Sequence, residues 1–191
     1  YPQSFEFSTH GGWIAHRGAG QQAGRYGKAG DWLVAAKVAT PRGLVSTEDF
    51  PASAAGPRLT DFFVGSEGLF GVVTQAQFRV HPVPEAYDFR GYLFRDFASG
   101  AAAIREATQN DLPASMLRLS DPDETYFYRS FSRVGKRDGL KQKIEEKILN
   151  MRGFGPRPCA LISVFEGDAA EVASARKAFA KIAKNLGAMS I

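Results

Sequence analysis

Two glycine-rich segments have residue types that could hold a ligand close to the backbone. The first begins at Ser8 and continues through Gly11 and Gly12 to Gly20, and the second is the run 65–74. Because glycine has no Cβ, its backbone amide can approach a phosphate or a flat ring system closely. From composition and spacing alone, a surface loop for the first segment and a bulge at a strand entry for the second remain the favoured interpretations.

Other common catalytic patterns do not occur in the sequence. There is no Gly-x-Gly-x-x-Gly after a strand and no P-loop. His10, His16 and His81 are scattered without metal-ligand spacing, so we expect no metal site. The single cysteine, Cys159, lies in an apolar run, where a buried and unreactive thiol is the usual state. It cannot form an internal disulfide, which favours an intracellular, cytoplasmic chain.

Arg118 is the one charged residue inside the otherwise apolar run Met116–Leu119. A guanidinium in a cleft or in a core needs an anionic partner. That partner could be an internal carboxylate, such as that of Asp121, or a phosphate of a substrate or cofactor. The sequence favours the internal carboxylate and the ligand phosphate equally.

Hydrophobic periodicity predicts the elements that must position these residues. In the first part we expect loops with short strands and one helical turn over 3–31, and a hairpin over 32–45. A short helix or turn should follow at 59–64, and strict alternation predicts a strand over 72–80.

The second part alternates strands and helices. We expect strands at 88–94, 115–119 and 159–166, and helices at 97–109, 121–129, 137–151 and 168–186. Asp168 and Glu171 have the spacing of a capping box for the last helix. This order predicts an α+β layer in which helices cover one face of an antiparallel sheet.

Composition divides the chain into two parts. Of the 20 glycines, 12 lie in residues 1–71, whereas the net charge of +4 comes from residues 86–191. The proline-rich stretch 81–85 lies between them and reads as a linker, so we predict domains at 1–85 and 86–191. The 9 Lys/Arg and 3 Asp/Glu of residues 129–157 favour a solvated helix face over a nucleic-acid surface.

Taken together, the two glycine-rich segments resemble the FAD-linked oxidases of the vanillyl-alcohol-oxidase/PCMH superfamily. Within it, the chain is most similar to the flavin-dependent alkyl-transferring branch that makes ether lipids. The resemblance follows the chain in order through the stretches 4–15, 26–31, 38–43, 65–74, 113–119 and 165–168.

The resemblance implies that residues 1–85 are the C-terminal lobe of a PCMH-type FAD-binding domain and that residues 86–191 are part of an α+β cap domain. Arg118 would be the catalytic residue. The residues expected to contact FAD are Gln3, Ser4, Phe5, Glu6, Phe7, Ser8, Thr9, His16, Arg17, Gly18, Ala19, Glu67, Gly68, Leu69, Phe70, Gly71, Val72 and Val73. The sequence departs from the family pattern at Gln3, His16 and Phe70.

The implied function is part of an FAD-dependent oxidoreductase or alkyl transferase acting on a small molecule with a phosphate or carboxylate. The alternatives are an FAD-linked dehydrogenase or oxidase of 2-hydroxy acids such as lactate or glycolate, and a non-catalytic partner-binding module. We expect no nucleic-acid partner. The resemblance does not decide whether the protein associates with a membrane. It is compatible with a homodimer, and in a eukaryote it would imply a peroxisomal location.

The resemblance also implies that the chain contains only part of the flavin site. The first flavin lobe should precede Tyr1, and a tyrosine and histidine cluster should follow Ile191. The 191 residues alone should therefore be inactive and should retain FAD weakly or not at all.

Overall fold

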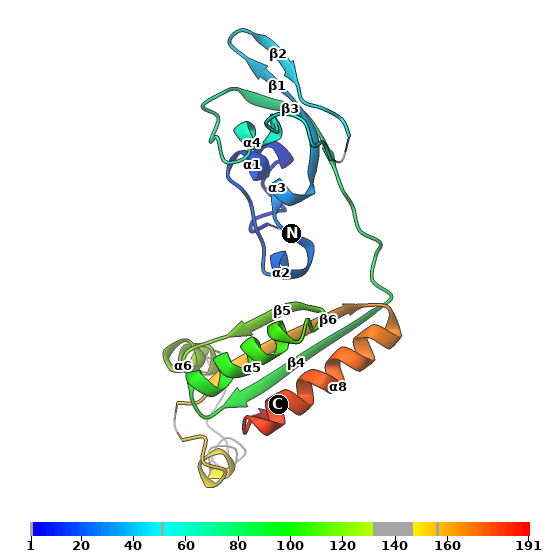
Figure 1. The fold of residues 1–191 in the computed structure, drawn as a ribbon. Helices are drawn as coiled ribbons and strands as arrows, with labels where there is room; N and C mark the ends of the chain where they lie inside the picture. Colours follow the sequence, from blue (N-terminus) through cyan, green and yellow to red (C-terminus); the bar gives the residue numbers. More distant parts are fainter. Residues whose placement is uncertain (1, 51, 132–146, 156) are drawn as a thin grey trace. The chain divides into compact units, whose positions relative to one another are not determined.

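The computed structural model describes residues 2–50, 52–131, 147–155 and 157–191. The chain divides into two compact units, Tyr1–Val83 and Pro84–Ile191 (Figure 1).

The first unit is built on a three-stranded antiparallel sheet. Strands β1 (Leu33–Thr40), β2 (Gly43–Ser46) and β3 (Val72–Phe78) lie in the order β2-β1-β3. Helices α1 (His10–Ala15) and α4 (Thr60–Phe63) pack against this sheet. The small core consists of Ile14, Leu33, Ala36, Val38 and Phe63. The predicted hairpin over 32–45, the helix near 59–64 and the strand over 72–80 are confirmed.

The prediction of short strands within residues 3–31 is wrong. This stretch forms three short helices, α1, α2 (Ala23–Tyr26) and α3 (Ala29–Trp32). Each is held by local hydrogen bonds, such as the one from the Gly12 N–H to the Thr9 side chain at the start of α1. Helices of four to six residues are too short to show a 3.6-residue period in the sequence.

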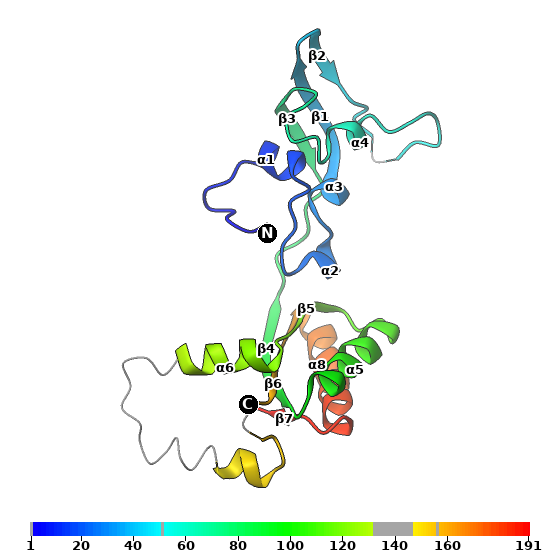
Figure 2. The same ribbon diagram turned by 90° about the vertical axis from the view of Figure 1, so that its left-hand side faces the viewer.

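The second unit contains a four-stranded antiparallel sheet in the order β5-β6-β4-β7. The strands are β4 (Ala86–Phe94), β5 (Ala114–Leu119), β6 (Cys159–Gly167) and β7 (Met189–Ser190). Figure 2 shows α5 (Phe97–Gln109) and α8 (Ala169–Asn185) on one side of this sheet and α6 (Pro122–Phe131) on the other.

The core of the second unit lies between the sheet and the helices α5 and α8. The ring of Phe179 on α8 packs against Tyr92 of β4 and Phe165 of β6, with ring centroids 5.4 and 6.0 Å apart. Burial of each such side chain contributes roughly 1.5–3 kcal/mol. Strand side chains alternate between faces, so residues such as Ala160 and Ile162 of β6 lie on the opposite face, toward α6.

The predicted α+β fold with an antiparallel sheet is confirmed, but the expectation that all helices lie on one face is wrong, because α6 packs on the face opposite α5 and α8. Helix α5 has the predicted bounds, and Asp168 caps α8 by accepting a 2.8 Å hydrogen bond from the Glu171 N–H. Most of the predicted 137–151 helix lies outside the described residues, although 147–151 are helical. Within the described part of the chain, none of the helices combines the length and apolar character needed to cross a membrane.

Candidate functional site

The two glycine-rich segments meet at the C-terminal end of α1. The Gly65 N–H donates to the Ile14 carbonyl at 2.9 Å, and the Glu67 N–H donates to the Ala15 carbonyl at 3.0 Å. At Gly11, a Cβ would lie only 3.4 Å from the Val73 carbonyl oxygen, so α1 and the start of β3 approach closely. The structure therefore places side by side two segments that are far apart in the sequence.

The predicted contact segment Gln3–Thr9 forms a turn that leads into α1. The Ser8 N–H and hydroxyl both donate to the Ser4 carbonyl, at 3.0 and 2.9 Å. The Trp13 indole N–H donates to the Ser8 hydroxyl at 2.6 Å and ties the turn to the helix. Ser4 has a φ of +59°, in the left-handed region.

The other two predicted segments also contain left-handed residues that are not glycine. Arg17 and Glu67 have φ values of +53° and +51°. Such residues carry strain of about 1–3 kcal/mol each and cluster at ligand-binding sites. The Arg17 Nε donates to the Val64 carbonyl at 3.3 Å. A Cβ at Gly65 would collide with the Arg17 side chain, so only glycine fits there.

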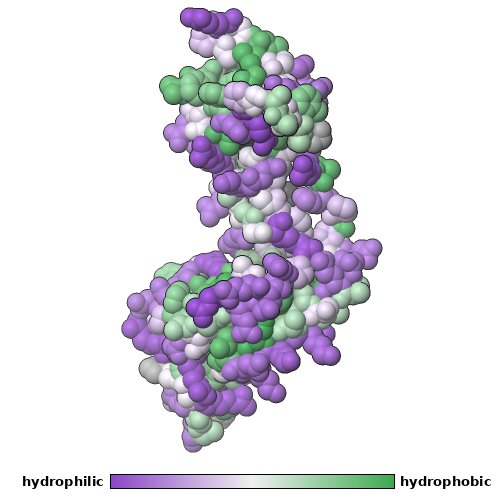
Figure 3. Space-filling view, viewed as in Figure 1, coloured by the Kyte–Doolittle hydropathy of each residue, from purple (hydrophilic) through white to green (hydrophobic). Residues whose placement is uncertain are grey.

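Large apolar side chains project from these same segments into solvent. Their exposed fractions are 48% for Phe5, 89% for Phe7, 80% for Leu69, 46% for Phe70 and 69% for Val72. Figure 3 shows apolar patches among hydrophilic residues on the surface of the first unit. Exposed apolar side chains at neighbouring positions, such as Leu69, Phe70 and Val72, mark a surface that something covers. Apolar side chains of this kind fit contact with the flat ring of a cofactor, whereas the N–H groups of Gly65, Glu67 and Gly71 already donate to carbonyls of the same unit.

The second candidate site is a cavity of about 620 Å³ on the face of the second sheet toward α6. Its walls come from the four strands, from α6 and from residues 148–149. They are mostly apolar, with the two cations Arg118 and Arg129 among them. The lining residues are Leu93, Arg118, Ser120, Thr125, Tyr128, Arg129, Ile148, Leu149, Ala160, Ile162, Met189 and Ile191.

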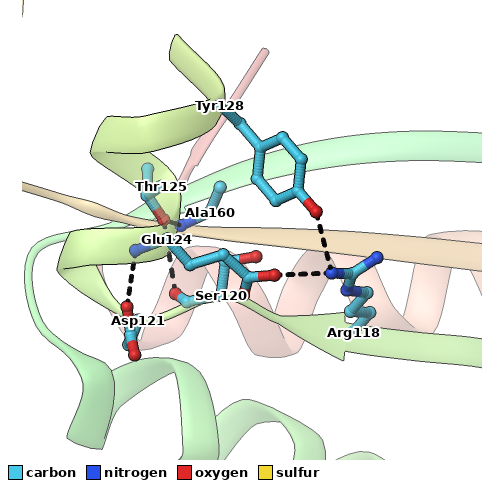
Figure 4. Close-up of polar contacts among 7 residues, drawn as sticks. All are labelled: Arg118, Ser120, Asp121, Glu124, Thr125, Tyr128 and Ala160. Atoms are coloured by element: carbon cyan, nitrogen blue, oxygen red, sulfur yellow. Dashed lines mark hydrogen bonds and ion pairs between the residues drawn. The ribbon is translucent and has the colours of Figure 1, made fainter. Parts of the chain in front are cut away.

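Helix α6 supplies the partners of Arg118: Tyr128, which lines the cavity, and Glu124, which is not among its lining residues (Figure 4). The Arg118 Nη2 lies 2.5 Å from Glu124 Oε1 and 3.5 Å from the Tyr128 hydroxyl oxygen. The centre of the guanidinium is 5.8 Å from the centroid of the Tyr128 ring. Hydrogen bonds to Tyr128 and Glu124 raise the pKa of Arg118, so this side chain keeps its positive charge.

The prediction that Asp121 could be the internal partner of Arg118 is wrong, because Glu124 takes that place. The Asp121 carboxylate is used elsewhere: it accepts a 2.7 Å hydrogen bond from the Glu124 N–H and caps the start of α6. Sequence reasoning missed Glu124 and Tyr128. Their i, i+4 spacing, which places both on one face of the helix, is the signal that could have found them.

A larger groove of about 810 Å³ lies beside α8 and β4. Its cations are Arg90 of β4 and Arg176, Lys177 and Lys184 of α8; sequence reasoning did not connect them, because the packing of α8 on β4 is a long-range contact. Asp88 pairs with two of them, 2.9 Å from Arg90 and 3.8 Å from Arg176.

The histidines have aromatic neighbours. His10 packs against Trp13 and Phe78, with ring centroids 4.5 and 5.5 Å apart, and His81 packs against Tyr26 at 5.0 Å. The described residues contain no group of three or more His, Cys, Asp and Glu that could hold a metal ion.

The fold is that of PCMH-type FAD-binding proteins. No family model matches the chain. A solved structure of alkyldihydroxyacetonephosphate synthase has a TM-score of 0.83 and 31% identity, and the match covers 99% of this chain and 34% of that one. The structure of p-cresol methylhydroxylase with substrate bound has a TM-score of 0.61 at 17% identity, which shows the fold alone.

Curated relatives give the same result. The chain is 32% identical to alkyldihydroxyacetonephosphate synthase of Caenorhabditis elegans over 189 residues, which covers 96% of this chain and 32% of that protein. It is 38% identical to the Dictyostelium discoideum enzyme of that name over 124 residues, covering 65% of this chain and 20% of that protein. A weaker match, 34% over 113 residues (58% of this chain, 19% of that protein), is a cytochrome-linked mitochondrial D-lactate dehydrogenase of Saccharomyces cerevisiae.

These comparisons confirm the resemblance to the FAD-linked oxidases of the vanillyl-alcohol-oxidase/PCMH superfamily that the sequence indicated. Within that superfamily it is similar to alkyldihydroxyacetonephosphate synthase over nearly its whole length. FAD is the cofactor of this family, in agreement with the prediction. The chain spans about a third of the length of the relatives that it matches from end to end.

Proposed function

We propose that the chain is part of an FAD-dependent enzyme that exchanges an acyl group for an alkyl group on a phosphorylated, long-chain substrate. The observation that carries this proposal is the apolar cavity of about 620 Å³ with Arg118 in its wall. A long hydrocarbon chain would cover the apolar wall, and the guanidinium would bind an anionic head group.

The first unit would hold the cofactor through the segments Gln3–Thr9, His16–Ala19 and Glu67–Val73. Two observations support these contacts: the hydrogen bond from the Glu67 N–H to the carbonyl of Ala15, the residue just before the second segment, and the exposed apolar side chains of the first and third segments. When bound, FAD supplies the reactive ring system, while the protein residues bind it, orient it and exclude water.

A second candidate is an FAD-linked dehydrogenase or oxidase of a 2-hydroxy acid. A guanidinium binds a carboxylate as well as a phosphate, and a D-lactate dehydrogenase is among the relatives. A small hydroxy acid, however, would leave most of the apolar wall of the cavity uncovered, and this favours the long-chain substrate.

The test uses the intact protein. We expect it to purify with bound flavin and to convert acyl-dihydroxyacetonephosphate and a long-chain alcohol into the alkyl ether and a fatty acid. An Arg118→Met variant should keep its flavin and lose at least about tenfold in kcat/KM for this exchange. Bleaching of the flavin by D-lactate or glycolate, without exchange, would establish the second candidate instead.

A colourless protein that takes up no added FAD would overturn both enzymatic candidates and leave the partner-binding module. We also propose that the protein is cytoplasmic, or peroxisomal if it comes from a eukaryote. Fluorescence microscopy of a tagged protein can check this location.

A further inference from the structure

Arg129 is a second cation in the wall of the cavity that contains Arg118. Arg118 comes from β5 and Arg129 from α6, so the two guanidinium groups reach the cavity of about 620 Å³ from different elements. None of the described residues that line this cavity has a carboxylate side chain, and Glu124, which pairs with Arg118 at 2.5 Å, is not one of them. A ligand in the cavity therefore meets two guanidinium groups.

The spacing of residues along α6 brings Arg129 to the cavity. Thr125, Tyr128 and Arg129 are the described residues of this helix that line it, and positions i, i+3 and i+4 lie on one face of a helix. Thr125 holds that face against β6, because its hydroxyl oxygen accepts a 3.0 Å hydrogen bond from the Ala160 N–H. Arg129 is half-buried on this face, so solvent screens its charge less than at an exposed position.

The number of cations bears on the kind of anion that the cavity can hold. A carboxylate has one negative charge and two oxygens, and a single guanidinium binds both oxygens in a bidentate pair. A phosphate monoester has close to two negative charges near neutral pH and three terminal oxygens, so it can accept hydrogen bonds from two guanidinium groups. Two positive charges on a mostly apolar wall also attract a doubly charged ligand more strongly than a singly charged one.

We propose that Arg129 is a specificity-determining residue: together with Arg118, it makes the cavity select a long-chain ligand that ends in a phosphate over one that ends in a carboxylate. Arg118 alone is sufficient for a carboxylate, whereas the phosphate uses both cations. This inference rests on the proposed function, whose two candidate substrates differ in this anionic group. It names the residue that separates them.

The test compares two probes with the same hydrocarbon chain, octyl phosphate and octyl carboxylate (nonanoate), by calorimetric titration of the intact protein at about pH 8, where the phosphate carries close to two charges. We expect the wild-type protein to bind octyl phosphate more tightly. In Arg129→Gln, the ratio of octyl phosphate affinity to nonanoate affinity should fall about three- to tenfold, as for the loss of one partly exposed charged contact. The nonanoate affinity itself should stay within about twofold, because Arg118 is still present.

Arg157→Gln is the matched control, because it removes the same charge from the same unit. Arg157 pairs with Asp123 near the start of α6 and does not line the cavity. This variant should leave the affinity ratio unchanged. An unchanged ratio in Arg129→Gln, or an equal fall in Arg157→Gln, would overturn the inference, since a general loss of positive charge would then explain the result.

A second measurement needs no variant and keeps the inference testable if Arg129→Gln does not fold. In the wild-type protein, raising the salt concentration should weaken octyl phosphate binding more steeply than nonanoate binding, because two charges on the ligand are screened instead of one. The shared hydrocarbon chain cancels the effect of salt on apolar contact. Equal salt dependence for the two probes would overturn the inference.

Neither titration uses flavin or turnover, so this inference and the proposed function can fail separately. A colourless, inactive protein with the expected affinity ratios would defeat the proposed function alone. An enzyme that contains flavin and carries out the exchange, but whose affinity ratio does not change in Arg129→Gln, would defeat only the role of Arg129.

Discussion

Thr125 Oγ1 accepts a 3.0 Å hydrogen bond from the backbone N–H of Ala160 and so ties α6 to β6. The Thr125 side chain is buried, and the Ala160 carbonyl accepts from the Ser120 N–H at 2.8 Å, just before α6 begins. This contact fixes the helix that carries both partners of Arg118. The geometry of the cavity therefore depends on a hydroxyl group that touches none of its charged residues.

Replacing Thr125 by valine should destabilise the protein by about 1–3 kcal/mol, because the partly buried Ala160 N–H loses its acceptor. Urea unfolding measures the change. The control is Thr108→Val on α5, where the hydroxyl donates to the Ile104 carbonyl at an exposed position. That variant should stay within about 0.5 kcal/mol of wild type. Equal losses in the two variants would show that the hydrogen bond to Ala160 is unimportant.

The sequence predicted those elements whose signals are local. Helix α5 has its predicted bounds because its N-cap and apolar stripe are both encoded within a few residues. Arg118 could be found because a charge stands out in an apolar strand. Glu124 could not, because its role depends on where α6 packs on the sheet, and that is set by tertiary contacts such as the one made by Thr125.

In the first unit, too, the local features could be predicted from the sequence and the long-range contacts could not. The glycine-rich segments were visible in the sequence, but their meeting at Ala15 is a long-range contact without a local signal. Only the resemblance to a family connected them in advance. The short helices between residues 10 and 32 were missed because four to six residues are too few to show a repeated apolar pattern.

The backbone at Gly71 permits no side chain. It has a φ of +147°, and a Cβ there would collide with the Ala39 carbonyl oxygen of β1. Gly71→Ala should therefore cost at least about 3 kcal/mol in unfolding free energy. Gly68 is the control, since its φ of +84° is also strained for alanine but its Cβ would meet no atom within 4 Å. Gly68→Ala should cost only about 1–2 kcal/mol. A Gly71→Ala loss no larger than this would show that β1 and β3 adjust freely.

Asp96 caps α5 by accepting a 2.7 Å hydrogen bond from the Ser99 N–H, and this bond lowers the pKa of the carboxyl group. Asp96→Ala should cost about 1 kcal/mol at pH 7. Because the folded-state pKa is lowered, the unfolded chain takes up the proton first as the pH falls. The difference in stability from wild type should therefore be complete above the ordinary value of 3.8 and shrink as the pH falls below it. Denaturant unfolding at several acidic pH values would show this.

The control for Asp96 is Asp123→Ala, which removes an exposed carboxylate in a surface ion pair with Arg157. Surface pairs of this kind contribute little, so we expect less than about 0.5 kcal/mol at neutral pH. If the cost of Asp96→Ala did not diminish in acid, the cap would not be acting through its charged form.

Cys159 is fully buried, and burial raises the pKa of its thiol. A disulfide reagent should therefore react with the native protein about 100-fold or more slowly than with the protein in urea. Above the ordinary thiol value of 9.0 the unfolded chain ionises while the folded one does not, so this residue should make stability fall as the pH rises. Cys159→Ala should remove that alkaline dependence. Rapid labelling of the native protein would contradict the burial of this thiol.

Phe7 tests the predicted cofactor contacts of the first unit. Its side chain is 89% exposed, so replacement by serine should change the unfolding free energy of the apoprotein by less than about 0.5 kcal/mol. If Gln3–Thr9 lines the flavin, the same change removes apolar contact with the bound cofactor. We then expect the intact protein to lose about tenfold in FAD affinity, measured from the flavin absorbance retained after gel filtration.

Val80→Ser is the matched control, because Val80 is 84% exposed in the same unit but lies outside the three predicted segments. It should change neither stability nor flavin content. A loss of flavin in Phe7→Ser alone, with both variants as stable as wild type, can arise only from a contact made in the flavin-bound state. Equal flavin content in both variants would remove Phe7 from the cofactor site. Exposed apolar residues such as Leu69 and Phe70 would then have to be covered by another part of the protein.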